Sequence, residues 1–395
     1  MKILLVYADD SYFWRNRMGM ACEVKDQGFD VVLLAPVSEH RSDIEKRGIR
    51  VIPWKLSRRS INPLRELGSF LQVLRTYRRE RPDIVQHEAL KAIIHGGMAA
   101  RLMGHVPSVN VICGLGSIFT RPTRRMKLLR ALMMRVLPVV FGNRNCRVVC
   151  MNDDNRNLLL KSGAVRDGQV GVIPGVGVCA ERFVERPEPD GVPIVLLPSR
   201  MLWEKGVREF VAAANELREK GISARFVLAG TPDEHNPGFI PEGQLKDWVR
   251  SGAVEWWGHC SDMPSIYAKS TIVCLPSYGE GLPNVLTEAG ASGRAVVATD
   301  VPGCRDVIRH EANGLLVPPR DATALAAAIR RLLEDTALRR RLGSVGRQRA
   351  VHEFSHEVIM ASTLSLYEAA LGGRWPKSAS SADGANVPEG VLSQP

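Results

Sequence analysis

Short apolar runs alternate with helix-like patterns along both halves of the chain. In the first half these runs are ILLVY (3–7), VVLLAP (31–36), DIVQH (83–87), VNVI (109–112), RVVCM (147–151) and GVIPG (171–175). In the second half they are IVLLP (194–198), RFVLAG (225–230), VEWWG (254–258), TIVCLP (271–276), AVVAT (295–299) and GLLVP (314–318). Uninterrupted valine, isoleucine and leucine are typical of strands covered on both faces. The pattern therefore predicts an α/β fold with parallel sheets, in which the helices are the crossovers.

The two sets of strands predict two doubly wound domains. The stretch ERPEPDGVP (185–193) is rich in proline and charge and lies between the two sets, so it is the expected join. We therefore expect an N-terminal domain over residues 1–186 and a C-terminal domain over 187–354. Residues 376–395 are small, polar and proline-bearing, a composition that favours a disordered tail.

Composition narrows the class of protein. The chain has 395 residues, of which 45% are hydrophobic, enough for two ordinary cores. Its eight cysteines form no CxxC pair, and its first residues lack the basic head and long apolar stretch of a signal peptide, so we expect a cytoplasmic protein. No window of the sequence is apolar enough to span a bilayer. The net charge of +11 favours an anionic partner: nucleic acid, anionic lipid or a phosphorylated small molecule.

Two glutamates follow the predicted strand at 271–276. Glu280 lies in the glycine loop SYGEGL, and Glu288 lies inside the helix that should begin near Pro283 or Asn284. Ligands of doubly wound sheets collect at the carboxyl ends of strands, where free helix amides bind anions. Glu288 is placed to accept hydrogen bonds from a ribose diol, and Glu280 to face the group attached to the phosphates. The spacing alone would favour an ordinary helix-surface charge and a turn residue, so the functional interpretation depends on the surrounding sequence.

Two cations strengthen the nucleotide hypothesis. Arg200 follows the strand at 194–198, and Lys205 lies at the start of the next helix, so both belong to the same sheet edge as Glu280. The chain contains no DxD motif that could hold a metal at a diphosphate. Arginine, lysine and helix amides would then stabilise a departing diphosphate. We therefore expect that the protein requires neither a metal nor a cofactor.

The second half, from about Ser199 to Val317, contains the motifs SRMLWEKG, FVLAG, WWGHCSDMPSIYAKS, PSYGEGLPNVLTEAGASGRAVVATDVPGCRDVI and NGLLVPPRD. In these motifs the chain resembles the retaining glycosyltransferases of family four. That family has the GT-B fold, two Rossmann-like domains facing across a cleft. The resemblance implies that the N-terminal domain binds the acceptor, that the C-terminal domain binds a nucleotide sugar, and that a helix over about 355–372 returns to the first domain.

The resemblance also assigns roles to residues of the donor site. Glu280 would be the catalytic carboxylate beside the donor sugar, Glu288 would bind the ribose, and Arg200 and Lys205 would hold the diphosphate. The sugar and phosphates would be contacted by Gly281, Leu282, Pro283 and Asn284, and the turn that begins at Gly258 could contact the base.

The first half resembles the family more weakly. The segment VNVICGLGSIFTRP (109–122) looks like the GLG segment of members that extend polyprenyl-diphosphate-linked oligosaccharides with N-acetylhexosamines. Many relatives have HxH where this chain has Gln86-His87-Glu88, and a histidine where it has Cys113, so the roles of those histidines do not transfer. The acceptor-side candidates are Asn16, Arg17, His87, Lys91, Gly114 and Gly116.

The implied activity is retaining transfer of a sugar from a UDP-sugar to a lipid-linked glycan, for surface polysaccharide or glycan assembly. Two alternatives stay open: a nucleotide-sugar-binding subunit without turnover, and a GT-B epimerase. A nucleic-acid partner is disfavoured because no RNA-binding aromatic motif or recognition helix is present. HEFSH (352–356) matches the zinc motif HExxH, but no apolar helix precedes it and it falls in the returning segment, so we reject a metal site there.

Region 121–147 is strongly basic, and no acidic residue occurs between Glu88 and Asp153. Within it, residues 124–137 predict a helix with leucine, methionine and valine on one face and cations around the other. Such a helix suits the surface of an anionic bilayer, so we expect peripheral association with the inner face of the membrane. The alternative is that its apolar face packs on the first sheet.

Overall fold

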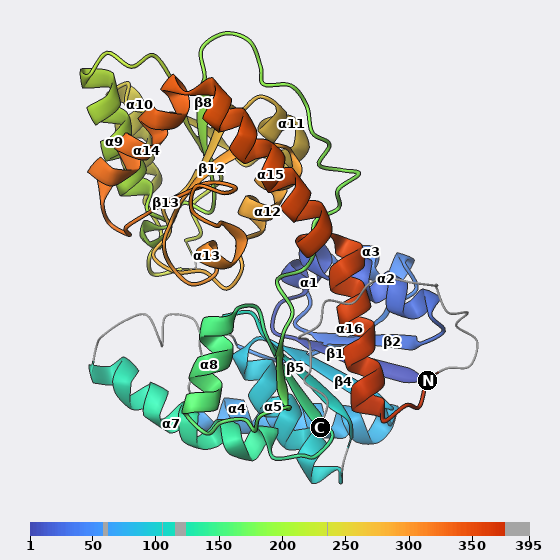
Figure 1. The fold of residues 1–395 in the computed structure, drawn as a ribbon. Coiled ribbons are helices and arrows are strands. Elements are labelled where there is room, and N and C mark those ends of the chain that lie inside the picture. Colours follow the sequence, from blue (N-terminus) through green and yellow to red (C-terminus); the bar gives the residue numbers. More distant parts are fainter. Residues whose placement is uncertain (58–61, 105, 115–123, 235, 376–395) are drawn as a thin grey trace. The chain divides into compact units, whose positions relative to one another are not determined.

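The computed structural model describes residues 1–57, 62–104, 106–114, 124–234 and 236–375, with only the backbone for 124–127. The expected tail at 376–395 lies outside these residues. The chain forms two compact units (Figure 1): Met1–Val176 together with the chain from Glu357, and Gly177–His356. Within the described residues, no helix combines the length and apolar character that crossing a bilayer requires.

The first unit contains a seven-stranded parallel sheet in the order β3-β2-β1-β4-β5-β6-β7. Its strands are β1 (Lys2–Tyr7), β2 (Asp30–Ala35), β3 (Arg50–Pro53), β4 (Ile84–Glu88), β5 (Ser108–Ile112), β6 (Cys146–Cys150) and β7 (Val170–Val172). All pairs are parallel, as the apolar runs predict. Only β3 has no counterpart among the predicted strands. It is a four-residue edge strand in which only Val51 and Ile52 are buried, too short a pattern to stand out.

Helices cover both faces of this sheet. They are α1 (Asp10–Asn16), α2 (Met18–Asp26), α3 (Arg41–Lys46), α4 (Pro63–Glu80), α5 (Leu90–Leu102), α7 (Arg124–Phe141), α8 (Asp153–Lys161) and α16 (His356–Leu371). Helix α16 packs in the first unit although it follows the second in sequence. Its Tyr367 hydroxyl donates to the Gln86 side chain of β4, and Trp375 beyond it lies edge-on to Phe29.

Helix α7 differs from its predicted arrangement. Leu128, Leu132, Met133 and Leu137 were expected on one apolar face, but Met133 and Leu137 are 5% and 0% exposed whereas Leu128 and Leu132 are 74% and 58% exposed. The helix continues to Phe141, and the side that packs on the sheet is the one that carries Met133 and Leu137. The packing alternative therefore holds for part of the apolar set, and a second apolar row faces outward.

The second unit contains a six-stranded parallel sheet in the order β10-β9-β8-β11-β12-β13. Its strands, all of them predicted, are β8 (Ile194–Pro198), β9 (Arg225–Ala229), β10 (Glu255–Gly258), β11 (Ile272–Leu275), β12 (Ala295–Thr299) and β13 (Leu315–Val317). The helical elements are η1 (Trp203–Lys205), α9 (Val207–Glu219), α10 (Glu242–Arg250), α11 (Met263–Ala268), α12 (Asn284–Ala291), α13 (Cys304–Val307), α14 (Ala322–Glu334) and α15 (Thr336–Phe354).

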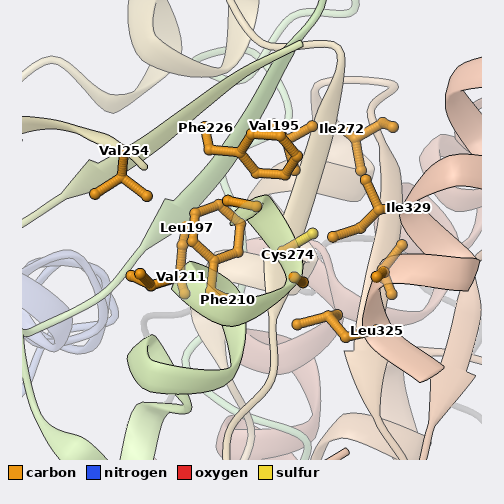
Figure 2. Packing of buried hydrophobic residues seen from close by; sticks show 14 of the residues in the cluster. Val195, Leu197, Phe210, Val211, Phe226, Val254, Ile272, Cys274, Leu325 and Ile329 are labelled. Carbon is orange, nitrogen blue, oxygen red and sulfur yellow. The ribbon is translucent and has the colours of Figure 1, made fainter. Parts of the chain in front are cut away.

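The core of the second unit lies between its sheet and the helices α9 and α14. Figure 2 shows buried side chains of β8, β9 and β11 meeting Phe210 of α9 and Ile329 of α14. Phe210 and Phe226 pack edge to face at 5.6 Å between ring centroids. This packing fixes the positions of the strand ends, where the candidate site lies.

The division between the units falls at Val176 and Gly177, before the expected join at 186/187. The segment that follows Gly177 is tied to the second unit, because Val178 N–H donates to Phe354 O at 2.8 Å and Arg347 donates to Phe183 O at 2.6 Å. Arg294, buried in the same unit, donates to Arg186 O at 2.9 Å. The proline-rich composition of 185–193 therefore marks a loop anchored by arginines.

Candidate active site

The loop that carries Glu280 joins β11 to α12, and the helix begins at Asn284 as predicted. The Ser277 hydroxyl and the Tyr278 N–H both donate to Glu204 O, at 3.1 and 2.9 Å. Tyr278 also donates its hydroxyl to Glu209 Oε1 at 2.7 Å, and the Arg320 guanidinium lies 4.5 Å from the centre of its ring. The loop is therefore held at its start to η1 and α9.

Lys205 and Glu280 form an ion pair. Lys205 Nζ lies 2.5 Å from Glu280 Oε1, and the two side chains are 16% and 11% exposed. Gly206, which follows Lys205, has φ +71°, and a Cβ there would lie 2.0 Å from Pro276 O. Only glycine allows this close approach of the two loops. The structure thus brings together the cation and the carboxylate that the sequence predicted at this edge.

Gly303 supports the Glu280 loop from the other side. It lies at φ +82°, and a Cβ there would come within 2.7 Å of Gly281 O and 2.8 Å of Glu280 O. The neighbouring Pro302 accepts the Glu280 N–H at 3.3 Å. Sequence reasoning gave Gly303 no role, although the motif PGCRD at 302–306 contains it.

Arg200 lies two residues beyond β8, in the loop that leads to Lys205. It pairs with Asp233, with 2.7 Å between Arg200 Nη1 and Asp233 Oδ2, and the two side chains are 58% and 28% exposed. An ion pair this exposed to water contributes little stability, about 0–1 kcal/mol, so an anionic ligand can replace Asp233 at low cost. Asp233 was not among the predicted site residues.

Glu288 lies in α12 and accepts a hydrogen bond from the Tyr267 hydroxyl of α11, with 2.9 Å between Tyr267 Oη and Glu288 Oε2. Burial raises the pKa of Glu288 to about 7, and the Tyr267 hydrogen bond and Arg182 act in the opposite direction. Glu288 is therefore a carboxyl that changes charge near neutral pH. Tyr267 is fully buried, and sequence reasoning did not identify it.

The remaining donor-side residues lie in the same unit. Gly281 and Asn284 are half-buried in the loop and first turn of α12, while the side chains of Leu282 and Pro283 are buried, which leaves their backbone as the part able to meet a ligand. Gly258 ends β10 at φ +66°, and nothing lies within 4 Å of a Cβ built there. Its carbonyl accepts the Gly230 N–H at 2.7 Å, which joins the ends of β9 and β10.

On the acceptor side, Arg17 is buried in an ion pair with Glu88 at the carboxyl end of β4. Arg17 Nε lies 2.9 Å from Glu88 Oε2, and Nη2 lies 3.0 Å from Oε1. The Tyr12 hydroxyl and the Cys113 thiol each donate to Oε1 at 2.8 Å. Burial, with the neighbouring Glu88 carboxylate, raises the pKa of Cys113 well above its ordinary value, so the thiol stays protonated. Glu88 and Cys113, two positions at which the sequence departs from the family pattern that it otherwise resembles, are thus in contact.

His87, another acceptor-side candidate, is buried within the first unit. It is 0% exposed, with the Tyr77 hydroxyl 2.6 Å from Nε2 and Asn110 Oδ1 2.7 Å from Nδ1. Since the Asn110 oxygen accepts, Nδ1 carries the proton, and the Tyr77 hydroxyl donates to Nε2. Burial lowers the pKa of His87 to about 4. Alternation along β4 puts this neutral ring on the face opposite to Glu88.

The other acceptor-side candidates occupy varied positions. The Asn16 amide donates to Tyr12 O at 3.1 Å, beside the Arg17–Glu88 pair. Lys91, near the start of α5, donates to Glu66 Oε1 at 2.7 Å. Gly114 is exposed directly after β5, and Gly116 lies outside the described residues.

The described part of the chain contains no group of three histidine, cysteine or acidic side chains placed to hold a metal ion. His352 and His356 of the HExxH match lie on different helices, because α15 ends before Ser355, which has extended backbone angles of φ −68° and ψ 157°. The one-turn spacing that a zinc ligand pair requires is therefore broken.

Two doubly wound parallel-sheet units, the second with cations and carboxylates at the carboxyl edge of its sheet, have the architecture of the GT-B fold. A solved glycosyltransferase from Rickettsia africae matches with a TM-score of 0.76 at 21% identity, covering 94% of this chain and 99% of its own. The predicted fold class is confirmed.

Two family models match the chain. The model "Glycosyl transferases group 1" matches residues 192–335, and "Glycosyl transferase 4-like" matches residues 2–140. The N,N'-diacetylbacillosaminyl-diphospho-undecaprenol alpha-1,3-N-acetylgalactosaminyltransferase of Campylobacter jejuni is 30% identical over 365 residues, covering 89% of this chain and 94% of its own length. The UDP-Gal:alpha-D-GlcNAc-diphosphoundecaprenol alpha-1,3-galactosyltransferase of Escherichia coli is 23% identical, covering 79% and 82%. The chain belongs to the family of glycosyltransferases that these two models describe, so the predicted family and enzyme class are confirmed.

Proposed function

We propose that the chain transfers an N-acetylhexosamine from a UDP-sugar to a sugar on a polyprenyl diphosphate, with retained anomeric configuration. The observation that carries the donor half is the Lys205–Glu280 pair at the edge where α12 begins. The names of the two curated relatives support the acceptor half, since both act on diphospho-undecaprenol glycans, and one uses UDP-galactose.

The leaving diphosphate meets Arg200, Lys205 and the first amides of α12. Arg200 leaves its ion pair with Asp233 and binds a phosphate oxygen. Lys205, which is paired with Glu280, also interacts with the diphosphate. Each well-placed donor to a charge that develops in the transition state lowers the barrier by roughly 3 kcal/mol. These groups act without a metal or a cofactor.

The transfer takes place on one face of the sugar. The bond between the anomeric carbon and the β-phosphate oxygen breaks, the acceptor oxygen bonds to the anomeric carbon from the same side, and the departing phosphate oxygen takes the acceptor proton. Glu280 orients the donor sugar and stabilises the positive charge that develops on its ring, without forming a lasting covalent bond. Glu288, held by Tyr267, accepts hydrogen bonds from the ribose.

The acceptor lipid is confined to a bilayer, so the enzyme works at the inner face of the membrane as a peripheral cytoplasmic protein. Region 121–147 contributes to this contact, with Arg130 and Arg135 exposed on α7. No nucleic acid takes part.

The test is a reaction of the full-length chain with a panel of UDP-, GDP- and ADP-sugars and a synthetic short-chain polyprenyl diphosphate sugar. We expect UDP release and a product heavier by one N-acetylhexosamine, with the donor's anomeric configuration in the NMR spectrum. Nucleotide binding without turnover would instead indicate a binding subunit, and interconversion of the donor sugar without transfer would indicate an epimerase.

A further inference from the structure

Exposed apolar side chains gather on three helices of the first unit. Among the described residues, nine of the thirteen exposed large hydrophobic side chains lie on α4, α5 and α7. Three are on α4, two on α5 and four on α7. Monomeric proteins scatter such residues singly, so a concentration on neighbouring helices marks an interaction surface.

The three helices form one layer on one face of the sheet. Val73 and Tyr77 of α4 pack in the same core as Ala99 of α5, and Ile93 of α5 packs in the same core as Leu137 of α7. Figure 1 shows α4, α5 and α7 together along one side of the first sheet. Their outer sides therefore form a single surface that faces away from the sheet.

The apolar residues of α4 form a row on its outer side. Leu64, Leu67 and Leu71 are 79%, 52% and 37% exposed, at the spacing of one helix face, while Val73 and Tyr77 on the opposite side are fully buried. The row has no role in the core of the unit. Its polar replacement therefore leaves the fold intact.

Helix α7 carries a second row. Leu128, Leu132 and Val139 are 74%, 58% and 50% exposed on the side opposite Met133 and Leu137. Because α4 and α7 follow the carboxyl ends of β3 and β5, the first halves of both helices lie toward that edge of the sheet. The leucines of both rows are in those halves, toward the carboxyl edge of the sheet, where the Arg17–Glu88 pair lies.

The charge on this surface has one sign. Helices α5 and α7 contain no acidic residue, and the two acidic residues of α4 are held in ion pairs: Glu66 with Lys91 at 2.7 Å, and Glu80 with Arg50 at 2.5 Å. Arg75 and Arg78 of α4 are exposed and continue its outer side. Arg130 and Arg135 of α7 are exposed as well.

We propose that the outer sides of α4, α5 and α7 form one docking surface for an anionic lipid bilayer, with the leucine row of α4 as a second anchor beside α7. Apolar side chains flanked by arginines complement lipid tails below anionic headgroups. A symmetric contact between two copies would instead set arginine against arginine. The inference rests on the proposed function, because a lipid-linked acceptor must reach the carboxyl edge of the first sheet from the membrane.

The experiment uses flotation of the full-length chain with vesicles of phosphatidylglycerol and phosphatidylcholine, or of phosphatidylcholine alone. One variant combines Leu64→Ser, Leu67→Ser and Leu71→Ser, and a second combines Leu128→Ser, Leu132→Ser and Val139→Ser. The matched control replaces three exposed valines of the second unit, which are 52%, 52% and 40% exposed: Val184→Ser, Val192→Ser and Val249→Ser.

We expect each helix variant to weaken binding to anionic vesicles by at least about tenfold, since each removes several CH₂ groups that would be buried in the bilayer. The control should bind like the wild type, and all three variants should keep the wild-type melting temperature. Vesicle binding by the α4 variant equal to that of the wild type would overturn the proposal, as would a change in oligomeric state with vesicle binding retained.

Transfer to a water-soluble short-chain acceptor separates this proposal from the proposed function. Both helix variants should transfer at the wild-type rate to that acceptor and more slowly to an acceptor embedded in vesicles. If the wild type transfers to neither acceptor, the proposed function fails, whereas flotation still decides the docking surface. Equal rates of all variants on the embedded acceptor would contradict the proposal.

Discussion

Lys205 Nζ lies 2.5 Å from Glu280 Oε1, so the cation assigned to the diphosphate and the carboxylate assigned to the sugar neutralise one another. Neither side chain is more than one-sixth exposed, and neither therefore depends on water for its charge balance. When a donor binds, its phosphate can pair with Lys205, and the positive charge that develops on its sugar ring can pair with Glu280. Both side chains therefore have an opposite charge beside them before the reaction and at its transition state.

We therefore expect Glu280→Gln to lower kcat by roughly a hundredfold, the scale for removing one preorganised charge from a transition state. Binding of UDP should be unchanged or slightly tighter, because Lys205 loses its competing carboxylate. Initial rates and calorimetry with UDP measure the two effects separately. A variant as active as the wild type would remove Glu280 from the mechanism.

Glu288→Ala should weaken UDP binding by about 1–3 kcal/mol, the range for losing charge-assisted hydrogen bonds to a diol. Tyr267→Phe removes only the hydroxyl that holds the carboxyl and should give a smaller loss of affinity. Calorimetry with UDP measures the loss of affinity in each variant. The affinity for uracil, which lacks the ribose, should be the same in both variants as in the wild type. Equal affinity of Glu288→Ala and wild type for UDP would reject the ribose role.

The pKa of Glu288 predicts how stability changes with pH. Burial raises it to about 7 in the folded chain, above the ordinary value of 4.5 that applies when the chain is unfolded. The unfolded state therefore loses this proton first, and the contribution of Glu288 to the free energy of unfolding falls as pH rises from about 4.5 to about 7. Thermal melts of Glu288→Gln between pH 5 and 8 should lack this part of the decline. Identical pH profiles for variant and wild type would contradict the assignment.

The parts of the fold and site that could be predicted are those that a local pattern specifies. Continuous apolar runs such as IVLLP and AVVAT predicted the strands of the second sheet, and the loop around Glu280 was recognised from adjacent residues. The four-residue edge strand β3 has no such run. The sequence did not reveal Asp233 and Tyr267 as site residues, because each contacts its partner only through tertiary packing. The partners, Arg200 and Glu288, lie 33 and 21 residues away in sequence.

The outer and inner sides of α7 show a similar limit. Its sequence predicts an amphipathic helix but does not show which part of the apolar face the sheet covers. Met133 and Leu137 are covered because the helix crosses the sheet on that side, and Leu128 is left outside. The row Leu64, Leu67 and Leu71 on α4 could have been noted from its spacing, but only burial distinguishes an outer row from a core row.

Transfer should proceed in the presence of EDTA. Arg200 and Lys205 supply the charge that a metal would otherwise provide at the diphosphate. The assay compares initial rates with EDTA, with EDTA followed by excess Mg²⁺, and with excess Mn²⁺, each at the same ionic strength. Activity that disappears with chelator and returns with metal would show that the diphosphate site has been misassigned.

Arg17 and Glu88 form an ion pair that is buried in the first unit. The two side chains are 6% and 1% exposed, and the carboxylate accepts hydrogen bonds from Arg17, Tyr12 and Cys113. Removing one partner of a buried ion pair leaves the other charge unpaired in a medium of low polarity. We therefore expect Glu88→Ala to lower the free energy of unfolding of the first unit by about 3–5 kcal/mol.

Matched variants separate charge from packing. Cys113→Ser keeps a donor to Glu88 and should cost little stability, while Arg17→Met combined with Glu88→Leu removes both charges and should recover most of what Glu88→Ala loses. Denaturant unfolding of Arg17→Met, of Glu88→Leu and of the double variant, followed by Trp fluorescence, gives the coupling energy from a double-mutant cycle. If Arg17→Met and Glu88→Leu add independently, the two residues are not a coupled pair. In that case the ion pair between Arg17 and Glu88 would not be an interaction that stabilises this edge of the sheet. A large coupling would show that the buried Arg17–Glu88 pair stabilises this edge, and Cys113→Ser near the wild type would show that a hydroxyl can replace the thiol as a donor to Glu88.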